Sequence, residues 1–103
     1  MSWADPHLAR LRAGETVQLR PHGGSMRGRI ESGQLVTIAP TMGDPDTGDA
    51  VLCRVRGRIY VHLVHAIRGH GGDRRFLIGN NIGGLNGWVS RAGILGVVVA
   101  VED

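Results

Sequence analysis

The sequence predicts a small, mostly β domain with scarcely any helix. Its 103 residues are about the size of a single domain. They include 17 glycines but only 4% aromatic residues, a composition typical of tight turns between short strands. Several short apolar segments alternate with polar residues, as half-buried strands do. We therefore expect one small coiled sheet or a partly closed β-barrel.

A short helix is expected at the start of the chain. Asp5 supplies a capping side chain, Pro6 fits the first helical turn, and Gly14 ends the segment. Residues 1–14 therefore form a helical lead-in, and residues 15–101 form the core of a single domain.

Strands follow at intervals set by glycine and proline. A strand over 16–20 runs into Pro21-His22-Gly23-Gly24, where glycine relieves the steric limits on the backbone, so Ser25 lies just beyond a sharp turn. A hairpin is expected around Gly57. The predicted elements are strands at 16–20, 34–39, 50–56, 59–67, 75–78 and 94–101, with loops at 43–49, 69–72 and 79–88.

Charge and composition argue against several classes of protein. The net charge is only +3, and the arginine stripe Arg54, Arg56 and Arg58 has no aromatic platform or recognition helix beside it, which does not favour nucleic-acid binding. No apolar run approaches the ~20 residues that span a bilayer, and no signal-peptide pattern opens the chain, so a cytoplasmic protein without membrane contact is expected. Cys53 is expected to be a small buried apolar side chain.

One strand carries two histidines on opposite faces. Because side chains alternate along a strand, His62 shares a face with Tyr60, whereas His65 shares the other with the apolar residues Val61 and Leu63. The two rings therefore do not ligate one metal ion, and no other spacing is typical of a zinc site. No metal and no cofactor is expected. Ser25, thirty-seven positions before His62, offers a nucleophile for which His62 can act as base.

Five segments resemble, in order, a known family. They are Gly23-x-Ser25-Met26, Ser32-Gly33, Gly48-Asp49-Ala50-Val51, Tyr60-Val61-His62-Leu63-Val64 and Phe76-Leu77-Ile78-Gly79-Asn80-Asn81. Together they resemble the signal peptidase and LexA-type repressor superfamily of serine peptidases over residues 15 to 101. His62 stands fourteen positions after Gly48, where LexA-type members carry lysine. Endoplasmic-reticulum and archaeal-type signal peptidases place histidine there, and this sequence is similar to that variant.

The resemblance implies a serine endopeptidase that acts on itself or on a partner protein. Ser25 is then the nucleophile, His62 the base, and the turn Gly23-Gly24-Ser25 the source of oxyanion-binding amides, while Met26 lines a substrate pocket or packs beneath it. The chain contains no lysine, so a Ser-Lys dyad is excluded. A histidine with a pKa of ~6.5 needs no large shift to act near neutral pH, unlike a lysine at ~10.4.

Several alternatives stay open from the sequence. A slip of three residues makes His65 the base instead of His62, and Asn80, Asn81 or Asp73 is the candidate that orients the ring. Met26-Arg27-Gly28 lacks the proline that the family often has two positions after the methionine. An inactive member of the same fold, serving as a dimerisation or protein-recognition module, is the second interpretation. Exposed sheet edges also favour a homodimer.

Overall fold

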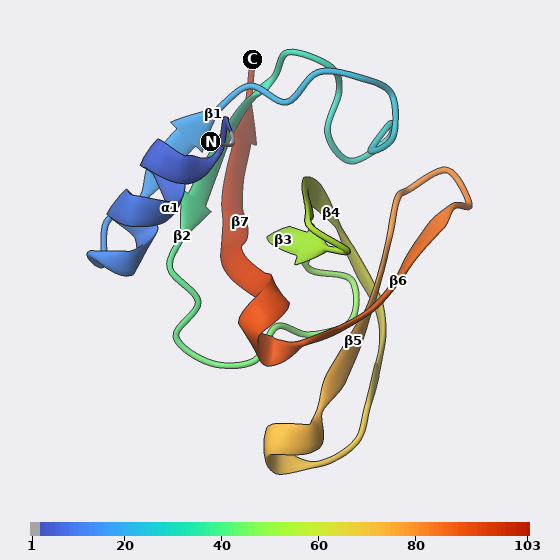
Figure 1. The fold of residues 1–103 in the computed structure, drawn as a ribbon. Helices are drawn as coiled ribbons and strands as arrows, with labels where there is room; N and C mark the ends of the chain where they lie inside the picture. Colours follow the sequence, from blue (N-terminus) through green and yellow to red (C-terminus); the bar gives the residue numbers. More distant parts are fainter. Residues whose placement is uncertain (1–2) are drawn as a thin grey trace.

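One antiparallel sheet and one short helix make up the fold. The computed structural model describes residues 3–103, and within them seven strands form a sheet in the order β1-β2-β7-β3-β4-β5-β6 (Figure 1). The elements are α1 Asp5–Arg12, β1 Val17–Leu19, β2 Leu35–Ala39, β3 Ala50–Val55, β4 Arg58–Arg68, β5 Arg75–Gly79, β6 Leu85–Ser90 and β7 Ile94–Glu102, with 3-10 turns at Gly71–Asp73 and Arg91–Gly93. The expected mostly β class is confirmed.

The sheet is open rather than closed into a barrel. Strands β1 and β6 form its two edges, and they do not pair with each other in the part of the chain that the structure describes. The described strands therefore do not close into a complete barrel. The sheet curves strongly, and α1 lies beside β1 (Figure 1) and also contacts β7.

Two hydrophobic clusters lie on the two faces of the sheet. The first contains α1 side chains together with residues of β1 to β4, and the second is built from β3 to β7. Strand β3 serves both, because Leu52 belongs to the first cluster while Val51 and Cys53 belong to the second. The largest fully buried side chain is Phe76 of β5. Burial on both faces holds the central strands, and with them β4, in a fixed position.

The hairpin of β3 and β4 is the predicted one. Arg56 and Gly57 join the strands with φ angles of 51° and 82°. Positive φ at both central residues is typical of the primed turns that match the twist of paired strands. The hairpin aligns Val51 with His62, which sets the position of His62 against the core.

Two predictions at the level of single elements are wrong. The helix begins at Asp5 with Ala4 as its N-cap, so Asp5 belongs to the first turn and does not precede the helix. Residues 79–88 are not one long loop, since Leu85 to Ser90 form β6 and pair with β5. Glycine and asparagine are weak strand formers, but β6 gains Val89, which is buried against the second cluster.

The described residues contain no helix long and apolar enough to cross a membrane.

Candidate active site

Ser25, His62 and Asn86 form a chain of hydrogen bonds. The Ser25 Oγ lies 3.1 Å from His62 Nε2, and Asn86 Oδ1 lies 2.7 Å from His62 Nδ1. The amide oxygen of Asn86 accepts a hydrogen bond from Nδ1–H, so Nε2 carries the lone pair and accepts a hydrogen bond from the Ser25 hydroxyl. This tautomer is the one that a general base for Ser25 requires.

The surroundings of His62 keep its ring neutral. The side chain is only 5% exposed and stacks on Tyr60, with ring centroids 4.7 Å apart. Burial lowers the pKa of His62 below 6.5. This effect outweighs the hydrogen bond that the ring donates to Asn86, which favours the charged form, and the nearby His65 lowers the pKa further. The ring is therefore unprotonated at neutral pH, ready to accept a proton.

A β-bulge directs Asn86 toward His62. Between β5 and β6 the register shifts, because Ile78 aligns with Gly87 whereas Gly79 aligns with Leu85, which leaves Asn86 as the extra residue. Such bulges turn a side chain out of the regular alternation and are frequent beside active sites. Gly87 has a φ of 137°, a conformation that favours glycine. Asn86 thus reaches across the end of β5 to a ring on β4.

The turn that follows β5 is bonded to the loop that carries Ser25. The backbone N–H of Asn81 donates to the Ser25 carbonyl at 2.8 Å, and its side-chain Nδ2 donates to the Arg27 carbonyl at 2.8 Å. Asn80 closes the same turn, since its Oδ1 accepts from the N–H groups of Ile82 and Gly84. The two asparagines therefore position Ser25 rather than contact the His62 ring.

The backbone around Ser25 leaves donors available. Among residues 3–103, the N–H groups of Gly24 and Ser25 donate to no protein acceptor. The N–H of Gly23 is instead engaged by the Ser32 hydroxyl at 3.0 Å, and Gly23 has a φ of 114°. Of the three residues expected to bind an oxyanion, Gly23 shapes the turn, while Gly24 and Ser25 have free amides.

His65 occupies a different environment from the one its strand position predicts. A bulge between Val64 and Ala66 interrupts the pairing of β4 with β5, and His65 is exposed rather than in the core. Its Nε2 donates to the Asn80 carbonyl at 2.8 Å. His65 therefore supports the turn after β5, and its ring does not bond to Ser25.

The sequence did not point to Asn86 as the partner of His62. Asp73 lies in the 3-10 turn between β4 and β5, and Asn80 and Asn81 make the contacts described above, so none of the three expected candidates bonds to the ring. Asn86 lay inside a segment interpreted as loop. The alternation of Leu85, Gly87 and Val89 around it is the available signal, but Gly87 and the bulge obscure it.

Cys53 is not an alternative nucleophile. Its side chain is fully buried in the second cluster, as expected. Burial raises the pKa of the thiol to about 12, against the opposing effect of a backbone hydrogen bond from His62. The unreactive, protonated form therefore predominates at neutral pH.

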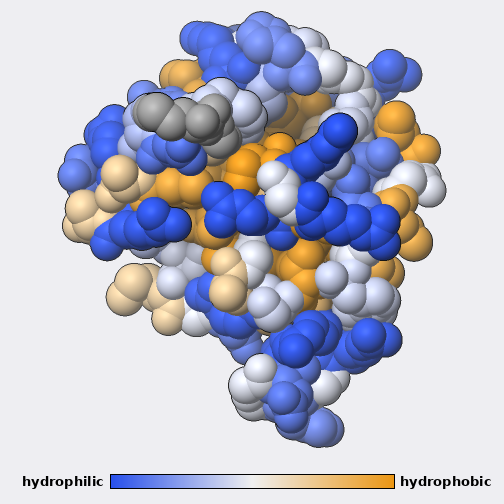
Figure 2. All heavy atoms as spheres, in the orientation of Figure 1, coloured by the Kyte–Doolittle hydropathy of each residue, from blue (hydrophilic) through white to orange (hydrophobic). Residues whose placement is uncertain are grey.

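An apolar groove of about 690 Å³ adjoins Ser25 and His62. Figure 2 shows apolar side chains gathered in a hollow of the face drawn there, bordered by hydrophilic ones. The groove is lined by Trp3, His7, Gln18, Leu19, Arg20, Pro21, His22, Gly23, Ser25, Met26, Ile30, Glu31, Ile59, Tyr60, Val61 and His62. Met26, only 4% exposed, both lines the groove and belongs to the first cluster. A volume of this size is typical of binding sites.

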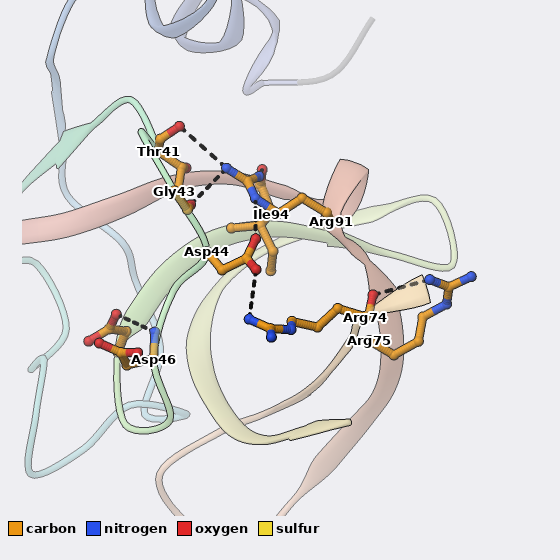
Figure 3. A network of polar contacts seen from close by, with 9 residues as sticks. Thr41, Gly43, Asp44, Asp46, Arg74, Arg75, Arg91 and Ile94 are labelled. Carbon is orange, nitrogen blue, oxygen red and sulfur yellow. Dashed lines mark hydrogen bonds and ion pairs between the residues drawn. The ribbon is translucent and has the colours of Figure 1, made fainter. Parts of the chain in front are cut away.

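A second polar network clamps the loop between β2 and β3 (Figure 3). Asp44 accepts from Arg74 at 2.9 Å and lies 3.3 Å from Arg91 Nε. Arg91 also donates to the carbonyls of Thr41, Gly43 and Ile94. The side chains of Asp44, Arg74 and Arg91 are more than one-third exposed. They join the loop to the residue before β5 and to the turn before β7.

Two other kinds of site were considered from the sequence. Arg54, Arg56 and Arg58 are all exposed near the tip of the β3–β4 hairpin. Among the described residues, no three histidine, cysteine or acidic side chains converge as a metal site would require.

No protein-family model matches the sequence, and no curated protein matches it significantly.

Proposed function

We propose that this protein is a serine endopeptidase with Ser25 as nucleophile and His62 as general base, a histidine variant of the signal peptidase and LexA-type fold. One observation carries the proposal. The Ser25 hydroxyl and the His62 ring lie 3.1 Å apart, and the far nitrogen of the ring is held by Asn86. A nucleophile, a base and an orienting group in this order are the recurring arrangement of acyl-transfer enzymes.

The first half of the reaction forms an acyl-enzyme. His62 Nε2 takes the proton of the Ser25 hydroxyl as Oγ bonds to the carbonyl carbon of the substrate, and the carbonyl π electrons move to oxygen. In this proposal, the N–H groups of Gly24 and Ser25, which have no acceptor among the described residues, donate to the oxyanion. The C–N bond then breaks, and the imidazolium gives its proton to the departing amine.

The second half restores the enzyme. Water attacks the ester carbon while His62 Nε2 accepts a water proton. The bond between that carbon and Ser25 Oγ then breaks in the second tetrahedral intermediate. The imidazolium returns the proton to Oγ, which releases the carboxyl product. Asn86 keeps Nδ1 protonated throughout, so Nε2 accepts and donates the proton in every step.

The backbone of β4 offers a docking edge for the substrate. β5 pairs with β4 only from Leu63 onward, and residues 59–62 therefore have one edge that β5 does not cover. Ile59 to His62 also line the groove. An extended peptide can add to this edge as a strand, with its carbonyl groups passing Ser25.

A recognition module without catalysis is the second candidate, and Asn86 favours it. An amide orients a neutral imidazole, but it stabilises imidazolium less than a carboxylate does. In this case the groove still binds an extended peptide, while Ser25 does not turn it over.

The test is labelling by a fluorophosphonate probe, read by the intact mass of the full chain. The peptidase proposal predicts one adduct on Ser25 that is absent in Ser25→Ala and retained in Ser90→Ala, since Ser90 is an exposed serine on β6. Proteome-derived peptides are then incubated with the same three proteins. New peptide ends that depend on Ser25 support a peptidase, and the absence of both adduct and cleavage favours the recognition module.

A further inference from the structure

The groove has an apolar floor, and aromatic rings close one of its ends. Met26, Ile30 and Val61 line it and are each less than one-tenth exposed. Trp3 and His7, at the N-terminal end of the fold, complete the wall and contact each other edge to face with centroids 6.3 Å apart. The apolar surface therefore extends well away from Ser25 and is continuous with it.

The size of the groove exceeds what a chain of small residues can fill. A methyl side chain occupies about as much space as one water molecule, roughly 30 Å³, whereas the groove holds about 690 Å³. A strand of alanine and glycine on the β4 edge leaves the half-buried Leu19 and Ile59 in contact with water. A leucine or phenylalanine side chain covers them and gains the hydrophobic contribution of a buried residue.

The charged residues that line the groove favour a bound peptide with an acidic residue. Arg20 lines the groove, donates to the Gly33 carbonyl at 2.7 Å and has no carboxylate partner among the described residues. Glu31, the acidic residue of the lining, already accepts from the Gly28 N–H at 2.7 Å. A substrate carboxylate therefore finds a free cation at this rim.

We propose that the groove selects extended peptides in which a bulky apolar side chain stands beside an acidic residue, close to the scissile bond. The inference rests on the proposed function, because it takes the occupant of the groove to be the substrate. The bulky side chain lies over Leu19 and Ile59, the peptide backbone lies along β4, and the carboxylate faces Arg20.

The experiment measures peptide binding to full-length Ser25→Ala by fluorescence anisotropy. The peptides are identical except for a central Phe or Ala and a neighbouring Glu or Lys. We expect Phe to bind about 10- to 100-fold more tightly than Ala, which is the effect of burying one large apolar side chain. Replacing Glu by Lys is expected to weaken binding several-fold, and Arg20→Glu is expected to reverse that order.

Two further variants test whether the peptide binds in the groove. Leu19→Trp fills it and is expected to abolish the advantage of Phe. Val99→Trp adds the same side chain to an exposed position on β7 outside the lining and is expected to preserve that advantage. Should Leu19→Trp fail to fold, Ile59→Trp provides the same obstruction from β4. Equal binding of the Phe and Ala peptides overturns the inference.

The wild-type chain separates this inference from the peptidase proposal. Ser25-dependent cleavage with a preference for alanine at the central position leaves the peptidase standing and overturns the groove preference. Tight binding of the Phe-Glu peptide without cleavage or fluorophosphonate labelling overturns the peptidase and supports the preference of the groove itself.

Discussion

The molecule contains two polar networks of opposite character. Around His62, three uncharged side chains are joined by two hydrogen bonds, with the ring only 5% exposed. Around Asp44, a carboxylate and two guanidinium groups meet where each side chain is more than one-third exposed. The first network contains no charged group and has a buried ring at its centre, whereas the second is charged and exposed to solvent.

The difference shows what each arrangement is suited to do. A buried ring with a lowered pKa presents a lone pair to a hydroxyl group, which is useful for proton transfer. Ion pairs at the surface hold a loop in place but are screened by salt and contribute little free energy each. Substitutions in the two networks, compared side by side, therefore separate effects on catalysis from effects on stability.

The largest expected effect is the loss of activity in His62→Gln. Removing the base is expected to lower kcat/KM by about 10²- to 10⁴-fold, the usual contribution of general base catalysis. The rate of Ser25 labelling by a fluorophosphonate and the rate of peptide cleavage both measure it. Asp44→Asn is the matched control and is expected to leave both rates unchanged. Equal losses in the two variants would contradict the assignment of His62.

Asn86 provides the next largest effect. Asn86→Ala leaves Nδ1 without its acceptor, so the ring loses its tautomer and orientation, and kcat is expected to fall on the order of 10- to 100-fold. Asn86→Asp supplies a carboxylate, which stabilises imidazolium and is expected to raise kcat above that of the wild type. The rise should be accompanied by a shift of the activity profile to higher pH, because the pKa of His62 increases. Unchanged pH profiles in both variants would count against a positioning role.

The pH dependence of the two networks is expected to differ. Because burial lowers the pKa of His62 in the folded state below 6.5, the unfolded state binds more protons as the medium becomes acidic. The contribution of neutral His62 to the free energy of unfolding is therefore complete above about pH 6.5 and is lost as the pH falls through the folded-state pKa. kcat/KM follows the same ionisation and is expected to persist to a pH below 6.5.

Urea unfolding measured from pH 8 to pH 5 tests this difference. Stability of the wild type is expected to fall more steeply toward pH 5 than that of His62→Gln, whereas Asp44→Asn keeps the wild-type slope. A steeper slope in His62→Gln would show that the ring is stabilised in its charged form.

The smallest expected effect is the loss of stability in Asp44→Asn. Both ion pairs disappear, but Arg91 keeps its three carbonyl acceptors, so the free energy of unfolding is expected to fall by about 0.5–1 kcal/mol. The loss should shrink in high salt. Asp46→Asn in the same loop is the control, and chemical denaturation at two salt concentrations is the measurement.

Much of the fold follows from local patterns in the sequence. The hairpin at Gly57 was predictable because its alternating flanks and a turn glycine agree. The assignment of His62 to the same face as Tyr60 was also predictable, and the stacked rings confirm it. The environment of His65 was not, because a bulge at Val64–Ala66 breaks the alternation on which the prediction depends.

By itself the sequence determined the mostly β class and the sharp turn before Ser25. Since the chain contains no lysine, it also limits the base of the proposed peptidase to histidine. Only the tertiary structure decided which group orients that histidine and what lies beside it. Asn86 reaches His62 through a bulge between β5 and β6, and the groove joins residues from α1, β1 and β4. Bulges and grooves depend on how distant strands pair and pack, and no local period of the chain encodes those long-range contacts.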